Sequence, residues 1–178
     1  MTKGRIISKR KVYQAKFFNV EEQEVEADDK RFIYSIVNRV PVIGVIPITD
    51  NNEVYLVSEY RYLFKKNILG LIGGHVDKGE NVLETAKREL KEEAGIEALE
   101  WIKLSDIEGS SSVIIAPATI YIAKKLQMGQ SEPEKFEDIK LIKLPLEEAV
   151  KKVISGEING SLSMIGILLL DKLINKKI

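Results

Sequence analysis

The sequence predicts an α/β (α+β) fold in which a mixed β-sheet is sandwiched between helices, with an antiparallel β extension at the N-terminus. Three observations favour this class. Stretches that alternate apolar and polar residues, as half-covered strands do, recur along the chain. The stretch Val40–Ile48 is almost wholly apolar, as expected of a strand covered on both faces. Helical patterns occupy the middle and the end of the chain and are outnumbered by strands, which favours a sheet between helices.

The N-terminal extension is the first predicted element. Lys11–Arg39 contains alternating segments for two or three short antiparallel strands, with a turn at Asp28–Lys30. A ribbon of two or three strands is marginally stable in water by itself. We therefore expect it to pack on the main domain or on a second chain, and we expect domains of residues 1–39 and 40–178.

The main domain is expected to alternate strands with three helices. Val40–Ile48 and Glu53–Tyr60 flank a turn at Asp50–Asn52, which predicts a hairpin. Asn81 as N-cap and Gly95 as a left-handed C-terminal stop predict a helix over Val82–Ala94. The other expected strands are Leu69–Ile72, Ala98–Leu104, Ser112–Lys124 and Ile139–Leu144, and the other expected helices are Leu146–Ser155 and Leu162–Ile174. Residues 127–138 are polar and predict an exposed loop.

Composition excludes several classes of partner. The 178 residues include 27 Lys and Arg, 27 Asp and Glu, and no cysteine. A balanced charge produces no overall field that attracts nucleic acid or an anionic membrane, so we expect neither partner. The absence of cysteine excludes disulfides and thiolate chemistry. No apolar stretch approaches the roughly 20 residues that span a bilayer, and the N-terminus does not read as a secretory signal. We expect a cytoplasmic protein.

The helix Val82–Ala94 is expected to have two distinct faces. At 100° per residue, one apolar stripe faces the core, formed by Leu83, Ala86, Leu90 and Ala94. Glu89, Glu92 and Glu93 share a second face. The ordinary explanation is an acidic face that only solubilises the helix. The preceding pair Gly73–Gly74 instead suggests a metal site, because carboxylates and a bare backbone carbonyl are the oxygen ligands that Mg²⁺ prefers.

The stretch Gly74–Ile96 resembles the Nudix box, G-x5-E-x7-R-E-U-x-E-E-x-G-U, in which U is apolar. Every specified position is met, by Gly74, Glu80, Arg88, Glu89, Leu90, Glu92, Glu93, Gly95 and Ile96. The pattern of strands, loop and helix around the box is similar to a Nudix domain from about Arg39 to the C-terminus. The resemblance implies hydrolysis of a nucleoside diphosphate linked to another group, by attack of water at phosphorus with Mg²⁺ or Mn²⁺ bound.

This resemblance also implies roles for single residues of the box. Glu89 and Glu93 would be the main metal ligands, and the carbonyl oxygen of Gly73 would be a backbone ligand. Glu92 would be a further ligand or would hold the water. Glu80 and Arg88 would contact these ligands and not the metal itself, with Arg88 fixing the orientation of a carboxylate. Residues that hydrogen-bond to metal ligands orient them in this way.

Outside the box, the sequence resembles the ADP-ribose pyrophosphatase branch of the family. That branch has a β extension exchanged between two subunits, an arginine after a tyrosine before the box, and a catalytic glutamate in a late acidic loop. By position, Arg61 would hold the diphosphate, with a surface salt bridge as the alternative. Glu137 would take the proton of the water, and Glu134 is the second candidate. The branch implies a homodimer that converts ADP-ribose or a related nucleoside diphosphate sugar to AMP and a sugar phosphate.

The residues that lead into the box depart from this branch. An acidic residue followed by Leu-Pro-Ala-Gly is usual there, whereas this chain has GLIGG over Gly70–Gly74. The run GGHVDKGE looks closer to Nudix enzymes that act on nucleoside triphosphates. Hydrolysis of (d)NTPs or dinucleoside polyphosphates therefore stays open, as does a Nudix module that senses a nucleotide without turnover. The isopentenyl diphosphate isomerases are discounted because they rely on a cysteine.

Overall fold

The computed structural model describes residues 4–109, 113–131 and 138–175, and the chain divides into two compact units. Unit 1 comprises Met1–Pro41 and Ile107–Pro117, and unit 2 comprises Val42–Asp106 and Ala118–Ile178. The boundary at Pro41 lies close to the predicted end of the extension at residue 39. Residues 107–117 belong to unit 1, although the sequence placed them in the second domain.

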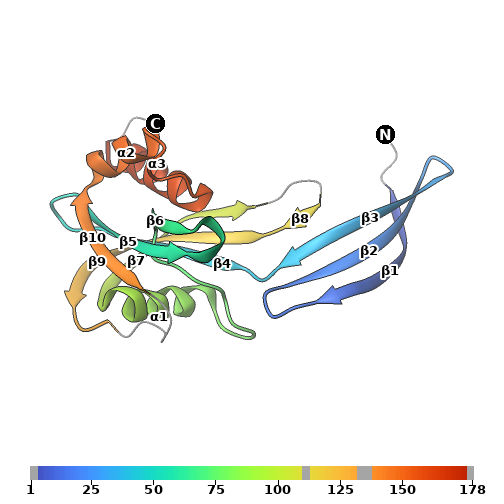
Figure 1. Ribbon diagram of the computed structural model, residues 1–178, viewed down its shortest axis with the longest axis horizontal. Helices are drawn as coiled ribbons and strands as arrows, with labels where there is room; N and C mark the ends of the chain where they lie inside the picture. Colours follow the sequence, from blue (N-terminus) through green and yellow to red (C-terminus); the bar gives the residue numbers. More distant parts are fainter. Residues whose placement is uncertain (1–3, 110–112, 132–137, 176–178) are drawn as a thin grey trace. The chain divides into compact units, whose positions relative to one another are not determined.

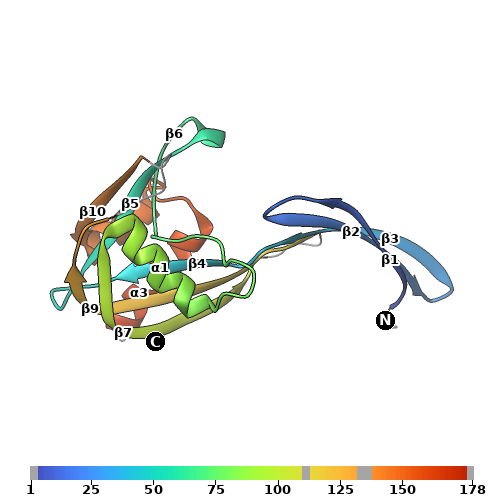
Figure 2. The ribbon, with the colours of Figure 1, turned by 90° about the horizontal axis from the view of Figure 1, so that it is seen from below.

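Unit 1 is built on a ribbon of three long strands, which Figure 2 shows as a twisted sheet. β1 (Arg5–Gln14), β2 (Phe18–Ala27) and β3 (Lys30–Arg39) pair antiparallel in that order, and the short β8 (Ile114–Ile115) adds to β3 in parallel. The predicted turn is present, because Asp28 and Asp29 both adopt left-handed backbone angles, with φ of 49° and 60°. Such residues join twisted antiparallel strands in tight hairpins.

Within the described part of the chain, unit 2 contains two three-stranded sheets and the three α-helices. The first sheet has the order β10-β5-β6 and the second has the order β4-β9-β7. Figure 1 shows α1 on one side of the sheets and α2 and α3 on the other, which confirms the predicted fold class. The elements are β4 (Val42–Pro47), β5 (Glu53–Arg61), the 3-10 helix η1 (Tyr62–Phe64), β6 (Lys66–Gly70), α1 (Val82–Ala94), β7 (Ile96–Glu108), β9 (Pro117–Met128), β10 (Ile139–Pro145), α2 (Leu146–Ile154) and α3 (Ser161–Asn175).

The predicted hairpin between Val40–Ile48 and Glu53–Tyr60 is wrong. β4 and β5 lie in different sheets and share only the bridge between Ile48 and Val54. β4 instead pairs in parallel with β9, from Val42 opposite Ala118 to Pro47 opposite Ala123. Both α1 and α3 contact β4. A strand covered in this way needs apolar side chains on both faces, and its parallel partner must come from a distant part of the chain.

The helix α1 begins and ends where the sequence predicts. The side chain of Asn81 accepts a hydrogen bond from the Leu83 N–H at 2.8 Å, and Gly95 closes the helix with φ of 63°. Glu84, in the first turn of the helix, forms an ion pair with Lys87 at 2.8 Å. The helix is therefore capped by its first and last flanking residues.

The apolar stripe of α1 belongs to the core of unit 2. Ala86 and Leu90 are fully buried, Ala94 is 5% exposed, and Leu83 packs against the same cluster while partly buried. Burial of one leucine side chain stabilises a fold by about 1.5–3 kcal/mol. This packing holds the adjacent acidic face of α1 in one orientation. Among the described residues, no helix is long and apolar enough to cross a membrane.

Candidate active site

A loop of residues 71–81 runs beside β4 and leads into α1. Its backbone forms isolated bridges with β4, Val45 with Ile72 and Val42 with His75. The Ile43 N–H donates to the Gly74 carbonyl at 2.9 Å. A Cβ atom on Gly73 would overlap the carbonyl oxygen of Ile43. Residue 73 must therefore be glycine for the loop to approach β4 this closely.

Two carboxylates of α1 reach the glycine pair. The Glu93 side chain accepts a hydrogen bond from the Gly73 N–H at 3.1 Å, and Glu93 is only 8% exposed. The carboxylate of Glu89 occupies the space that a Cβ atom on Gly74 would need. The sequence indicated that these residues belong together, and the structure shows the contact: the glycines make room for the carboxylates.

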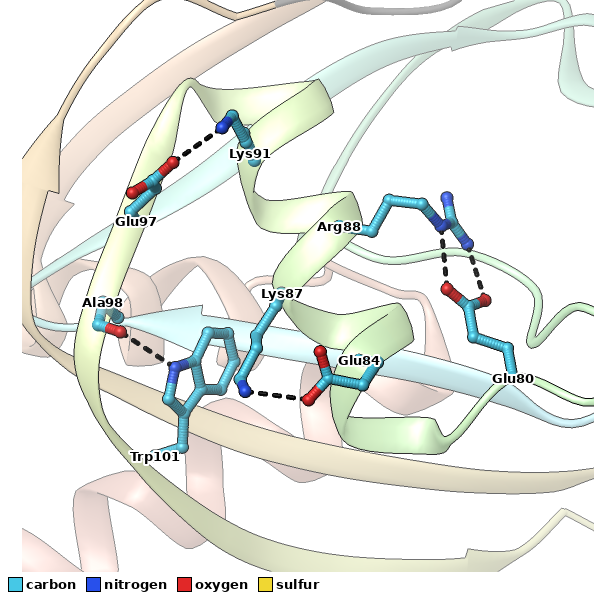
Figure 3. A pocket seen from close by; sticks show the side chains of 8 residues that line it. All are labelled: Glu80, Glu84, Lys87, Arg88, Lys91, Glu97, Ala98 and Trp101. Carbon is cyan, nitrogen blue, oxygen red and sulfur yellow. Dashed lines mark hydrogen bonds and ion pairs between the residues drawn. The ribbon is translucent and has the colours of Figure 1, made fainter.

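Arg88 is the centre of the acidic face. Its Nη1 donates to Glu89 and to Glu92, both at 2.9 Å, while its Nε and Nη2 donate to the two oxygens of Glu80 at 3.1 and 3.2 Å. Figure 3 shows the double contact with Glu80. A planar guanidinium that binds one carboxylate with two donors has a defined orientation. Arg88 therefore links the loop that precedes the helix to two carboxylates of the helix itself.

The environment of Glu80 strongly favours its ionised form. Hydrogen bonds from Arg88, and then from the Thr85 hydroxyl at 2.8 Å, lower the pKa of Glu80 to about 2. Hydrogen bonding to the charged form of an acid stabilises that form. The pKa of Arg88 is raised, chiefly by its hydrogen bonds to Glu80. This pair is fully charged across the physiological pH range.

The donor atoms of this cluster suit a hard divalent cation. Within the described residues, no three Asp, Glu or His side chains are already arranged around one point as metal ligands. The cluster nevertheless brings three carboxylates, of Glu80, Glu89 and Glu92, to a single guanidinium, and a fourth, of Glu93, to the Gly73 N–H, which leaves excess negative charge beside the Gly73–Gly74 backbone. Oxygen donors without thiolates are the ligands of Mg²⁺ and Mn²⁺. The residues present therefore fit such an ion.

The remaining predicted site residues lie outside the box. Arg61 ends β5 and forms an ion pair with Glu59 at 2.7 Å, with 54% of the Arg61 side chain exposed. Arg61 thus forms a salt bridge, which the sequence analysis gave as the alternative to a contact with the diphosphate. Glu134 and Glu137, the two candidate bases, lie outside the residues that the structure describes. Their roles stay predictions.

Two features of the site were not foreseen from the sequence. Thr85 is fully buried and its hydroxyl donates to Glu80. The sequence signal that could have predicted this contact is the spacing of Thr85, three residues before Arg88 and so on the same face of the helix. A cavity of about 610 Å³ also lies between α1 and the first half of β7 (Figure 3). Its lining consists of Glu80, Glu84, Lys87, Arg88, Lys91, Glu97, Ala98 and Trp101. Its lysines are paired, Lys87 with Glu84 and Lys91 with Glu97, each at 2.8 Å.

The sequence pattern of the NUDIX domain matches residues 38–158, which is more than half of the chain. The chain belongs to the Nudix family. The match includes the whole glutamate-rich helix with its preceding glycines, so the geometry around Arg88 is that of a Nudix box. The predictions of the family and of an enzyme of the hydrolase class are confirmed.

Several known proteins are similar to this Nudix hydrolase over most of its length. A methanol dehydrogenase activator of Bacillus methanolicus is 29% identical, over 92% of this chain and 93% of that protein. An ADP-ribose pyrophosphatase of Bacillus subtilis (strain 168) is 26% identical, over 86% and 85%. The ADP compounds hydrolase NudE of Escherichia coli (strain K12) is 29% identical, over 82% and 80%. The crystal structure of an ADP compounds hydrolase aligns with a TM-score of 0.86 at 24% identity, covering 99% of this chain and 97% of that chain, which shows the shared fold.

Proposed function

We propose that this Nudix hydrolase cleaves the pyrophosphate bond of ADP-ribose or of a related nucleoside diphosphate sugar, and releases AMP and a sugar phosphate. The observation that carries the chemistry is the contact of Glu89 and Glu93 with Gly73–Gly74, oriented by Arg88. The choice of substrate is supported by the relatives named ADP-ribose pyrophosphatase and ADP compounds hydrolase, which match most of this chain.

Within this proposal, the box residues hold Mg²⁺ or Mn²⁺. Glu89, Glu93 and the carbonyl oxygen of Gly73 would be ligands, and Glu92 would be a further ligand or would hold the water. The bound ion would neutralise charge on the diphosphate and polarise the phosphorus that is attacked. Arg88 keeps the carboxylates of Glu89 and Glu92 in place through its two bonds of 2.9 Å. Glu80 in turn fixes Arg88.

The proton and the leaving group need residues outside the box. Glu137, or Glu134 as the second candidate, would take a proton from the water as its oxygen bonds to phosphorus. The bond between that phosphorus and the bridging oxygen then breaks, and the bridging oxygen leaves with the second phosphate. Arg61 would bind the diphosphate with its planar fork. For this it would exchange part of its contact with Glu59, a pair in which the Arg61 side chain is 54% exposed and the Glu59 side chain is 13% exposed.

A second substrate class is favoured by the residues that precede the box. Gly70–Gly74 reads GLIGG, which departs from the usual pattern of the ADP-ribose branch and looks closer to Nudix enzymes of nucleoside triphosphates. The two classes differ in their products. Release of AMP and a sugar phosphate supports the first, whereas release of pyrophosphate from (d)NTPs supports the second.

A product screen tests both classes and the sensing alternative together. The purified chain is incubated with ADP-ribose, other nucleoside diphosphate sugars, NADH, diadenosine polyphosphates and (d)NTPs, each with Mg²⁺ and with Mn²⁺. We expect the highest kcat/KM with ADP-ribose or a related sugar, and no turnover with chelator. A Glu93→Gln control excludes a contaminating hydrolase. Binding of a nucleotide without any turnover would support a sensing module and contradict the proposal.

We further propose that the extension of residues 1–39 is exchanged between two subunits. The ribbon exposes many large apolar side chains for its size, including Val12, Tyr13, Phe32, Ile33 and Tyr34, which are 46–72% exposed. Large apolar side chains exposed in this number on one ribbon favour an interaction surface. Sedimentation equilibrium should give twice the mass of the 178-residue chain. A stable monomer at micromolar concentration would contradict the exchange.

A further inference from the structure

Helix α3 makes a hydrogen bond to the chain just before the box. The Leu71 N–H donates to the hydroxyl oxygen of Ser163 at 3.0 Å, although the two residues are 92 positions apart in sequence. Ser163 is only 8% exposed, and the other buried residues of α3 are Gly166, Ile167 and Leu170, none of which has a polar side chain. This buried hydroxyl therefore joins α3 to the loop that leads to the carboxylates of α1.

Three glycines allow α3 and β4 to approach Leu71 closely. A Cβ atom on Gly70 would lie 2.8 Å from the Ser163 hydroxyl oxygen. A Cβ atom on Gly166 of α3 or on Gly44 of β4 would lie 3.0 or 3.1 Å from the Leu71 Cδ1 atom. The backbone and the side chain of Leu71 are thus both in contact with the elements that surround it.

The chain that follows Leu71 is held by β4 at alternate residues. The carbonyl oxygens of Ile72 and Gly74 accept hydrogen bonds from β4 at 2.8 and 2.9 Å. In an antiparallel pairing, residues that bond to the partner strand alternate with residues that do not, so Gly73 is the residue that faces away from β4. Its N–H donates to Glu93 at 3.1 Å. The position of the loop along β4 therefore determines where the backbone of Gly73 meets this carboxylate.

We propose that Ser163 is a positioning residue for the metal site. By accepting the Leu71 N–H, it fixes the loop two residues before Gly73, whose carbonyl oxygen is the proposed backbone ligand. The inference rests on the proposed function. A buried N–H that loses its acceptor is costly, so removal of the hydroxyl would favour a shift of the loop. Groups that orient metal ligands typically account for 10- to 100-fold in metal affinity or activity.

The first test measures metal binding without any substrate. Ser163→Ala should raise the dissociation constant for Mn²⁺ about 10-fold in calorimetric titration, and should lower kcat while leaving the KM of the nucleotide substrate unchanged. Ser161→Ala removes an exposed hydroxyl from the same helix and should change none of these values. Val153→Ala truncates a buried side chain of α2. It should lower the thermal midpoint but leave Mn²⁺ affinity unchanged, which separates positioning from a general loss of stability.

A double-variant cycle tests whether the hydroxyl acts through the loop. The Cβ atom of Gly70→Ala would displace the Ser163 hydroxyl, so this variant should also weaken Mn²⁺ binding. In the Ser163→Ala background the nearest atom of residue 163 would be its Cβ, at 3.9 Å, which is an ordinary contact. Residues that act through one contact give non-additive losses, so we expect the double variant to bind Mn²⁺ as Ser163→Ala does.

Several outcomes would overturn the inference. These are wild-type Mn²⁺ affinity in Ser163→Ala, an equal loss of affinity in Val153→Ala, losses that multiply in the double variant, and absence of Mn²⁺ binding by the wild-type chain. Absence of turnover by a wild-type chain that binds Mn²⁺ would instead contradict the proposed function, and the comparison of Mn²⁺ affinities would still decide the role of Ser163.

Discussion

Unit 1 and unit 2 both contain many apolar and charged residues, but they differ in how far these side chains are buried. In unit 2, buried side chains such as Ile43, Leu90 and Ile167 form a core, and one arginine binds three carboxylates at its edge. In unit 1, none of the described residues is buried, and charges pair across the ribbon, as Arg10 does with Glu22 and Arg31 with Glu24. Charged and apolar substitutions should therefore have large effects in unit 2 and small effects in unit 1.

The largest expected effect is on turnover. Glu93→Gln should lower kcat/KM by about 100-fold or more, because groups that bind or orient a catalytic metal typically account for 10- to 100-fold or more in activity. The glutamine oxygen can still accept the Gly73 N–H, so the thermal midpoint should change little. Glu26→Gln in unit 1 is the control and should retain the wild-type rate. Near-normal turnover of Glu93→Gln would remove this residue from the metal site.

A core truncation compares the stability of the two units. Leu90→Ala should reduce the free energy of unfolding by about 2–5 kcal/mol, as truncation of a fully buried leucine does. In a single subunit, Ile33→Ala, at a side chain that is 72% exposed, should change it by about 0.5 kcal/mol or less, whereas the proposed exchange of the ribbon should make the loss larger. Both are measured by urea unfolding. A loss at Ile33 as large as that at Leu90 would show that the ribbon is covered in solution, which would sharpen the case for a second subunit.

Acid should weaken unit 2 through Glu80. The pKa of Glu80 is about 2 in the folded chain and near 4.3 in an unfolded one. Because the folded pKa is the lower, this stabilisation is present above about pH 4.3 and is lost as the pH falls toward 2. The difference in thermal midpoint between the wild type and Glu80→Gln should therefore shrink from pH 6 to pH 2. A difference that stays constant with pH would contradict this role.

The smallest effect is expected in the charge pairs of unit 1. Arg31 contacts Glu24 at 3.3 Å and Glu26 at 3.5 Å, but 64% of its side chain is exposed. Exposed ion pairs contribute about 0.2–1 kcal/mol, so Arg31→Ala should change the free energy of unfolding by no more than this. The measurement is repeated at high salt, where the difference should vanish. A larger loss would mean that Arg31 is buried against another chain.

Local sequence was sufficient for the elements whose signals are short-range. The bounds of α1 followed from Asn81 and Gly95, and the turn at Asp28–Asp29 followed from residues that accept left-handed angles. The sequence predicted that Glu93 and Gly73 lie close together, because Gly73 directly precedes the box that contains Glu93. Arg88 was expected to orient a carboxylate, whereas its simultaneous contacts with Glu80, Glu89 and Glu92 depend on side-chain geometry that the sequence does not give.

Long-range pairing could not be predicted in the same way. β4 and β5 are adjacent in sequence and resemble a hairpin, yet β4 pairs with β9. This pairing is part of the packing in which α1 and α3 both contact β4, and that packing is not visible in local sequence. The burial of Thr85 depends likewise on the surrounding fold.

By itself, the sequence determined the family, the acidic helix with its caps and the type of chemistry, because these depend on residues within one stretch of the chain. Only the tertiary structure decided which strands pair, how Arg88 shares its donors and which residue accepts the Leu71 N–H. Each of these depends on atoms that come together only when distant segments pack, as Ser163 of α3 does against Gly70 and Leu71.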